Sequence, residues 1–125
     1  MDEHTVIARW GAAVDHFNQG DLQPLADMLA EDCEFHASTG PVGTTRAEII
    51  DNLRAGLEEG WTGHYPLGLT AAGNFLAGVY RNEYADGTSV IAAGILRFGD
   101  DGKIVEMRSI EPPEFVAMVA ANEAT

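Results

Sequence analysis

The stretch over residues 75–111 constrains the fold most, because apolar and polar residues alternate there and two Asp-Gly pairs interrupt the alternation. Asp-Gly between two alternating runs is typical of a tight hairpin turn. The sequence therefore predicts an antiparallel meander of three long strands. The predicted strands are Phe75–Tyr84, Ser89–Phe98 and Lys103–Glu111, joined at Asp86-Gly87 and Asp101-Gly102.

The first half of the chain has the spacing of helices instead. A first helix is expected to end at Gly20, which suits a left-handed cap. Its apolar face is formed by Ile7, Trp10, Val14 and Phe17. A second helix is expected to follow with Asp21 as its N-cap. The buried stripe of this second helix is formed by Leu22, Leu25 and Leu29.

A third helix is predicted by Thr45 and Glu48, which match a capping box, and Gly60 is expected to end it. Its inner face is formed by Ile49, Ile50, Leu53 and Leu57. Several shorter elements complete the prediction. These are a strand over Cys33–His36, a loop over Ser38–Gly43, a strand over His64–Thr70 and a terminal helix around Phe115, Val116 and Val119.

Helices in one half and strands in the other indicate the α+β class, in one domain over residues 1–125, rather than alternating βαβ units. The strand Ser89–Phe98 is apolar on both faces, so both faces are expected to be covered. The helices can cover one face. A second copy of the chain is expected to cover the other, around Ile91, Ala93 and Ile95, which predicts a homodimer.

The composition excludes several classes of partner. The net charge is −13 with only seven Lys and Arg, which argues against nucleic acid and anionic membranes. Cys33 is the single cysteine, so no internal disulfide forms, and the N-terminus lacks the pattern of a signal peptide. We expect a cytoplasmic protein. There is no HExxH, paired cysteine spacing or Gly-rich phosphate loop, so neither a metal nor a cofactor is expected.

Two segments carry a resemblance to a known family. They are AAVDHFNQGDLQPLADMLAEDCEFH, from Ala12 to His36, and ILRFGDDGKIVEMRSIEP, from Ile95 to Pro112. With the order of elements over nearly the whole chain, they resemble the SnoaL-like branch of the nuclear transport factor 2-like superfamily. The resemblance implies a cone-shaped, cystatin-like fold in which a curved antiparallel sheet wraps around the N-terminal helices and encloses a pocket.

Members of this superfamily include ketosteroid isomerases, limonene epoxide hydrolases and polyketide cyclases, and others only bind ligands or associate. The fold alone therefore does not give the function. The resemblance places Ala13, Ala37 and Gly94 where ketosteroid isomerases have a tyrosine, an aspartate base and a protonated acid. All three groups are lost, so this chain is not expected to isomerise steroids by that machinery.

Limonene epoxide hydrolases use an Asp-Arg-Asp relay. Arg81 and Glu83 resemble its first half, with Glu in place of Asp, whereas Ser109 stands at the second aspartate. The relay is thus half present. The strand register that turns Met107 inward also turns Arg81 and Glu83 outward, which favours a solvated pair.

The last predicted strand gives the clearest chemical indication. Val105, Met107, Ser109 and Glu111 share one face, because side chains alternate along a strand. That face begins apolar and ends polar, with Glu111 near the expected mouth of the pocket. A carboxylate beside an apolar cavity can transfer protons near neutral pH. The alternative is that Glu111 has left the sheet before Pro112 and is solvated.

Other candidates also have two interpretations. His36, at the end of the first strand, suits an acid or base but also a structural hydrogen bond. Tyr80, Asn82 and Tyr84 can orient a ligand or fill core volume. Trp10 and Phe17 can line the pocket wall or belong only to the hydrophobic core.

The sequence thus predicts a cofactor-independent enzyme that acts on a small hydrophobic metabolite by acid/base chemistry, as an isomerase, a cyclase or an epoxide-opening hydrolase. Glu111 and His36 are predicted to transfer protons. The predicted substrate-binding residues are Trp10, Phe17, Tyr80, Asn82, Tyr84, Met107 and Ser109. The alternative functions are a non-catalytic ligand-binding domain and a dimeric association module.

Overall fold

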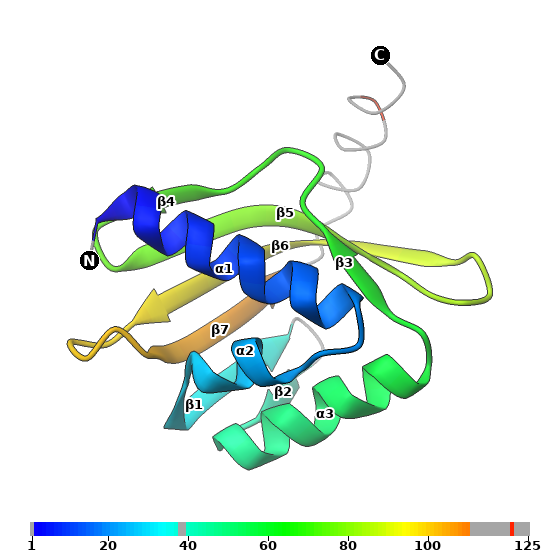
Figure 1. Ribbon diagram of the computed structural model, residues 1–125, viewed down its shortest axis with the longest axis horizontal. Coiled ribbons are helices and arrows are strands. Elements are labelled where there is room, and N and C mark those ends of the chain that lie inside the picture. The colour runs from blue at the N-terminus through cyan, green and yellow to red at the C-terminus, as the bar shows by residue number, and fades with distance from the viewer. Residues whose placement is uncertain (1, 38–39, 111–120, 122–125) are drawn as a thin grey trace.

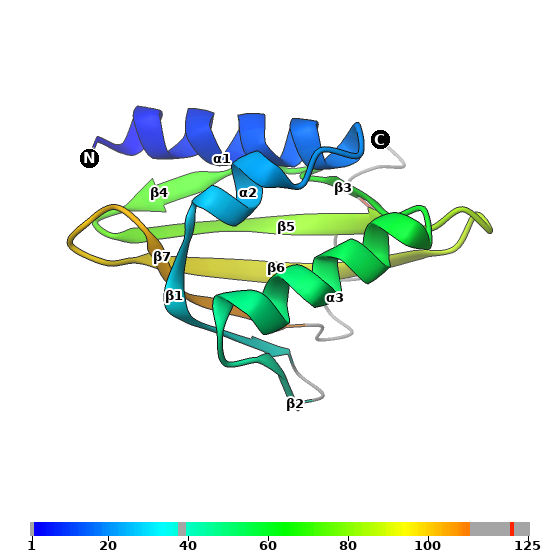
Figure 2. The ribbon, with the colours of Figure 1, turned by 60° about the horizontal axis from the view of Figure 1, so that its bottom comes forward.

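The computed structural model describes residues 2–37, 40–110 and 121. Its helices are α1 (Glu3–Asn18), α2 (Gln23–Asp27) and α3 (Arg46–Glu58). Its strands are β1 (Leu29–Ala37), β2 (Gly40–Gly43), β3 (Thr62–His64), β4 (Thr70–Ala72), β5 (Phe75–Glu83), β6 (Ser89–Phe98) and β7 (Ile104–Ile110). The strands form one curved sheet in the order β2-β1-β7-β6-β5-β3, with β4 beside β5. The helices lie along one face of this sheet (Figures 1 and 2).

The predicted meander is confirmed. Strands β5, β6 and β7 pair antiparallel in sequence order, and both hairpins turn at the expected glycines. Gly87 and Gly102 have φ of 87° and 78°, in the left-handed region that favours glycine. The carboxylate of Asp86 accepts a hydrogen bond from the backbone N–H of Thr88 at 3.0 Å, which fixes the first turn.

The sheet is mixed rather than antiparallel throughout, because β1 runs parallel to β7 with Phe35 opposite Met107. A parallel pair needs a long crossover, and the chain between these strands contains α3 and most of the sheet. No tight turn therefore fixes their relative direction. The α+β class and the curved sheet wrapped around helices are as expected.

The second helix is shorter than predicted and the first strand longer. Leu29, expected on the helix stripe, instead begins β1 and is fully buried opposite Ile104. Leu25 and Leu29 are four residues apart, a spacing that fits a helix face although α2 ends at Asp27. Asp21 lies one residue before the N-cap position and accepts a hydrogen bond from the backbone N–H of Gln23 at 3.2 Å.

Two other segments differ from the prediction. The expected loop over residues 38–43 contains β2, which pairs with the end of β1. The expected strand over residues 64–70 is divided into β3 and β4, and the residues between them do not pair with β5. Pro66 has no backbone N–H to donate and Gly68 has φ of 79°, so a continuous ladder is interrupted there.

The helices bury one side each against the sheet. Asp2 caps α1 by accepting from the backbone N–H of Thr5 at 2.9 Å. The buried face of α1 is Val6, Trp10, Ala13 and Phe17, so it is rotated from the predicted face. The predicted capping box of α3 is present in part: the N-cap Thr45 accepts from the N–H of Glu48 at 3.2 Å, whereas Glu48 accepts from the N–H of Thr44, one residue before the N-cap, at 2.9 Å.

The inward and outward faces of β6 are as predicted. Ala92 and Leu96 are buried on the side of the helices, whereas Ile91, Ala93 and Ile95 are half-buried on the other side. The predicted terminal helix around Phe115 lies outside the described residues. No helix among the described residues is long and apolar enough to cross a membrane.

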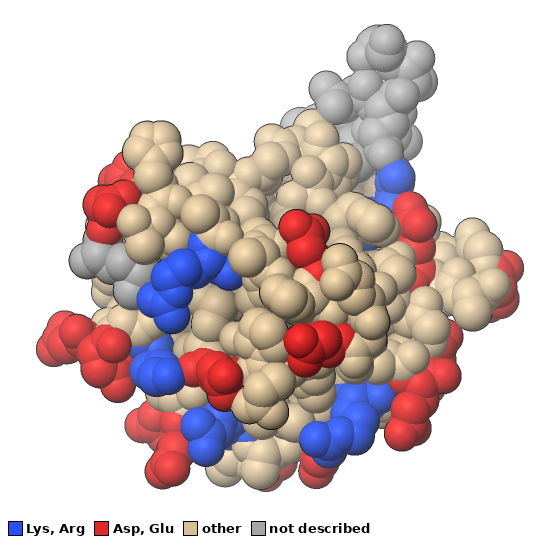
Figure 3. All heavy atoms as spheres, viewed as in Figure 1, with Lys and Arg blue, Asp and Glu red and all other residues tan. Residues whose placement is uncertain are grey.

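Basic side chains do not gather on the face that Figure 3 shows. Lys and Arg are separated there by acidic and uncharged residues. This distribution agrees with the net charge of −13 and gives a polyanion no continuous surface to bind on this face.

Candidate functional site

A pocket of about 350 Å³ lies between the concave face of the sheet and the helices α1 and α3. Its lining is mostly apolar and aromatic. The lining residues are Trp10, Val14, Phe17, Leu25, Phe35, Ala37, Val42, Asn52, Leu53, Trp61, Gly63, His64, Tyr65, Tyr80, Asn82, Tyr84, Val90, Leu96, Met107, Arg108 and Ser109. This volume suits a small organic molecule.

The pocket brings together all seven residues that the sequence assigned to substrate binding. They come from three regions far apart in the chain, namely α1, the end of β5 and the end of β7. The structure thus places these side chains around one cavity. Their role toward a ligand remains a prediction.

Two of these residues form a hydroxyl pair inside the pocket. The hydroxyl of Tyr80, on β5, is 2.5 Å from Oγ of Ser109, on β7, and Ser109 is buried. The Tyr80 ring lies over Gly94 on the intervening strand β6, where an added Cβ would be 3.1 Å from Cδ1 of the ring. The missing side chain at Gly94 therefore gives the ring room to reach across β6.

Tyr65 belongs to the pocket although sequence reasoning missed it. Its hydroxyl accepts a hydrogen bond from Nε1 of Trp10 at 2.7 Å, and its ring packs edge-on against Tyr80 with centroids 6.4 Å apart. Burial raises the pKa of the Tyr65 hydroxyl to about 12, so this hydroxyl stays protonated at neutral pH. The sequence assigned Tyr65 to a continuous strand. It did not indicate that the strand is interrupted between β3 and β4, and so it did not indicate where the Tyr65 side chain lies.

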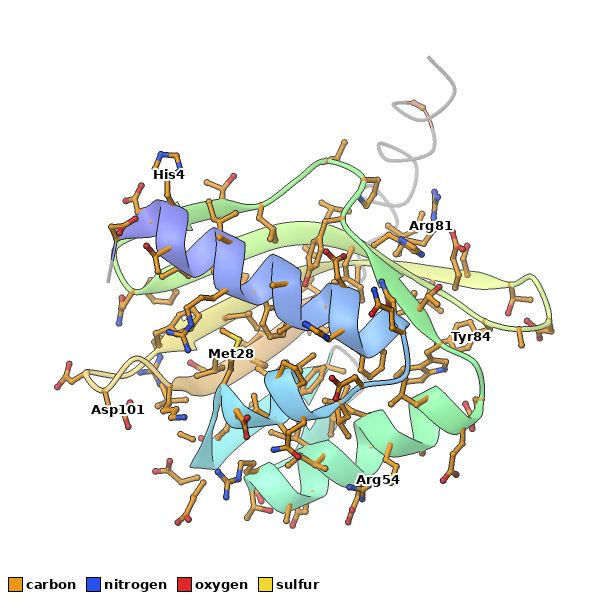
Figure 4. All side chains as sticks on the ribbon, in the orientation of Figure 1. His4, Met28, Arg54, Arg81, Tyr84 and Asp101 are labelled. Carbon is orange, nitrogen blue, oxygen red and sulfur yellow. The ribbon has the colours of Figure 1, made fainter. Side chains whose placement is uncertain are left out.

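Trp61 is a second residue that the sequence did not single out. It packs edge-on against Tyr84 with ring centroids 5.5 Å apart. Figure 4 labels Tyr84, which lies near the C-terminal end of α3. The indole of Trp61 lies directly on the helix at Gly56, where an added Cβ would be only 2.3 Å from Cε3. A glycine inside a helix, five residues before a tryptophan, is a signal for this close contact.

Of the two predicted proton-transfer residues, the structure describes only His36. His36 is not among the lining residues, because Phe35 and Ala37 on either side of it face the pocket. Its Nε2 is instead 3.7 Å from a carboxylate oxygen of Glu34. Glu111 lies outside the described residues.

Two basic side chains, His64 and Arg108, border the pocket but contact groups outside it. Nε2 of His64 is 3.2 Å from Oγ1 of Thr62 and 3.8 Å from a carboxylate oxygen of Glu83. The guanidinium group of Arg108 is 2.7 Å from the carboxylate of Glu106. Glu83 faces away from the pocket, because its neighbour Asn82 lines it, and no carboxylate lines the pocket in the described part of the chain.

The structure describes the three residues that the resemblance aligned with the functional positions of ketosteroid isomerases. Ala13 is buried in α1, Ala37 lines the pocket, and Gly94 lies under the ring of Tyr80. None of them carries an ionisable side chain. Within residues 2–37 and 40–110, no cluster of His, Cys, Asp and Glu is arranged to hold a metal ion.

Solved structures with the same fold are similar to the chain at low sequence identity. A Kribbella flavida protein assigned provisionally as a ketosteroid isomerase has a TM-score of 0.75 and 20% identity, over 89% of this chain and 80% of that chain. An NTF2-like protein of unknown function from Cytophaga hutchinsonii has a TM-score of 0.69 and 12% identity, over 90% and 91%. A protein of unknown function with a cystatin-like fold, from Methylobium petroleophilum, has a TM-score of 0.70 and 16% identity, over 85% and 72%.

These likenesses show the fold and not the activity, because all three identities are low. No curated protein matches the chain by sequence. The model of the SnoaL-like domain matches residues 10–107, which include most of the pocket. The chain is therefore a member of the SnoaL-like domain family, within the NTF2-like fold.

Proposed function

We propose that the chain binds a small, largely apolar molecule in the pocket between the sheet and the helices. The observation that carries the proposal is the lining of this pocket, in which aromatic and aliphatic side chains surround a few uncharged polar groups. Such pockets gain binding free energy from apolar burial and specificity from a few polar contacts.

The polar groups favour a neutral ligand. Tyr80, Asn82 and Ser109 present hydroxyl and amide groups, whereas the guanidinium group of Arg108 and the imidazole of His64 contact carboxylates outside the pocket. An unpaired ionic group on the ligand would lose its hydration without gaining an opposite charge. We therefore propose that these three residues orient a neutral, oxygen-bearing molecule.

Native mass spectrometry of the purified chain tests the binding proposal. We expect a retained compound of low mass, which denaturation releases for identification. A chain that carries no compound and takes up none from a library of small apolar molecules would contradict the proposal.

A cofactor-independent acid/base enzyme is the second candidate function. It is favoured by the Tyr80–Ser109 hydroxyl pair: one hydroxyl donates to the other, and the second can then donate to a ligand oxygen on which negative charge develops. Glu111, two residues after Ser109 in the sequence, is the proposed proton carrier. The reaction would then be an isomerisation, a cyclisation or an epoxide opening.

Replacing Glu111 by Gln separates the two candidates once a ligand is identified. The enzyme proposal expects Glu111→Gln to abolish turnover and to leave binding intact. The matched variant Glu58→Gln, at the exposed end of α3, should turn over normally. Equal turnover in both variants would remove Glu111 from the mechanism.

We also propose a homodimer through the outer face of the sheet, around Ile91, Ala93 and Ile95. These side chains are half-buried and lie side by side on β6, opposite the helices. A charge there would be costly to bury in an interface. Light scattering should show a dimer for the wild type and a monomer for Ile95→Glu, and a monomeric wild type would contradict this proposal.

A further inference from the structure

The hydroxyl of Tyr65 makes a hydrogen bond in which its oxygen is the acceptor. Nε1 of Trp10 donates to this oxygen at 2.7 Å, and Trp10 is only 4% exposed. An indole N–H can only donate, whereas a tyrosine hydroxyl both accepts and donates. The contact therefore leaves the proton of Tyr65 unused.

No acceptor for this proton is found among residues 2–37 and 40–110, where Trp10 is the one hydrogen-bond partner of the Tyr65 side chain. Hydroxyl groups in protein interiors normally use their donors, because an unmatched donor in apolar surroundings costs about 1–3 kcal/mol. Tyr65 lines the pocket, so the missing acceptor can come from a bound molecule.

The segment that carries Tyr65 is held in place from both sides. The side-chain amide of Asn18 donates to the carbonyl of Gly63 and accepts from its N–H, both at 2.7 Å. Next to Tyr65, the chain packs so closely on β5 that a Cβ at Gly78 would be 2.9 Å from Cδ2 of Leu69. The hydroxyl is therefore positioned before a ligand arrives, which reduces the entropy cost of binding.

We propose that Tyr65 is a ligand-binding residue that donates its O–H to a neutral oxygen acceptor, such as a ketone or ester carbonyl, on an apolar skeleton. The assignment rests on the proposed binding function and names the chemical class of its ligand. The raised pKa of Tyr65 agrees with a donor that stays protonated. A carboxylate ligand is disfavoured, because the guanidinium group of Arg108 is bound to Glu106.

Two compounds of nearly equal shape test this assignment. 2-Acetylnaphthalene carries a carbonyl acceptor and 2-ethylnaphthalene carries none. Isothermal titration of both compounds gives a ratio of dissociation constants for each variant of the protein. We expect Tyr65→Phe to shift this ratio against the ketone by about five- to tenfold, the range of one net hydrogen bond, with unchanged affinity for the hydrocarbon.

Thr70→Val is the control, because it removes an exposed hydroxyl on β4 outside the pocket; its ratio of dissociation constants should stay that of the wild type. Equal ratios for Tyr65→Phe and the wild type would overturn the assignment while binding itself stands. If neither compound binds the wild type, the binding function fails and the assignment fails with it.

The infrared carbonyl stretch of 2-acetylnaphthalene bound to the wild type tests the assignment without a variant. We expect a lower frequency than in hexane, because a hydrogen bond weakens the C=O bond. A hexane-like frequency would overturn the assignment even if Tyr65→Phe fails to fold.

Discussion

The hydroxyl of Tyr80 meets Oγ of Ser109 at 2.5 Å although β6 lies between their strands. The contact depends on Gly94, which is paired with Ser109 and lies beneath the Tyr80 ring. A side chain at this position would occupy the volume that the ring now fills. The absence of a side chain at Gly94 thus lets the hydroxyl of Tyr80 reach across β6 to Ser109.

We predict that Tyr80 and Ser109 are energetically coupled. A double-mutant cycle with Tyr80→Phe and Ser109→Ala should give a coupling free energy of about 0.5–1.5 kcal/mol in urea unfolding. Thr70→Val with Ser109→Ala is the control, since Thr70 is exposed on β4 and outside the pocket, and this pair should be additive. Additivity in both cycles would contradict the hydroxyl pair.

The same substitution in two helices should change stability in opposite directions. Gly56→Ala places a Cβ 2.3 Å from the indole of Trp61, so the ring must move, and we expect a loss of about 1–3 kcal/mol. Gly11→Ala meets no atom within 4 Å and should gain about 0.5–1 kcal/mol from helix propensity. Urea unfolding measures both, and a stabilised Gly56→Ala would contradict the close contact.

Glu106 should make stability depend on pH. Arg97 and Arg108 donate to its carboxylate at 3.1 and 2.8 Å, and these hydrogen bonds hold the pKa of Glu106 below its usual 4.5. The folded chain therefore resists protonation of Glu106 more than the unfolded chain does. The resulting stabilisation is present above the unfolded pKa and is lost as pH falls through the lower folded pKa.

Unfolding free energies of the wild type and Glu106→Gln, measured from pH 7 to pH 3, test this expectation. The variant should be less stable at pH 7, and the difference should shrink below about pH 4.5, the usual pKa. A difference that stays constant over the whole range would show that the two arginines do not stabilise the ionised form.

Cys33 should react only when the chain unfolds. Its side chain has no exposed surface, and burial, with smaller contributions from Asp32 and Glu34, raises its pKa to about 11. The thiolate is the reactive form, so both access and ionisation are suppressed. Ellman's reagent at pH 8 should modify Cys33 rapidly in urea and very slowly without it, and equal rates would contradict its burial.

Local chemistry made much of this fold predictable. The Asp-Gly turns and the alternation in β6 fixed the meander and its inward faces, and Thr45 with Glu48 marked the start of α3. The parallel pairing of β1 with β7 was not predictable, because it is decided by tertiary packing between distant segments. β2 was missed for a related reason: Gly40 and Pro41 are turn residues in isolation and pair only because β1 offers its edge.

The site was predictable where it lies on regular strands. Tyr80, Met107 and Ser109 face the pocket because side chains alternate along β5 and β7. By the same alternation, His36 points away from the pocket, because its neighbours on β1 face inward. Tyr65 was not predictable, because its position depends on the interruption at residues 65–69 and on the indole of Trp10.

The central claim is that the pocket between the sheet and the helices receives a small apolar molecule. Leu53 on α3 lines this pocket, whereas Leu67 is 43% exposed outside it. Isothermal titration of 2-acetylnaphthalene should show that Leu53→Trp weakens binding by about tenfold or more, since the indole fills the cavity, and that Leu67→Trp binds like the wild type. Undiminished binding by a folded Leu53→Trp variant would contradict the claim.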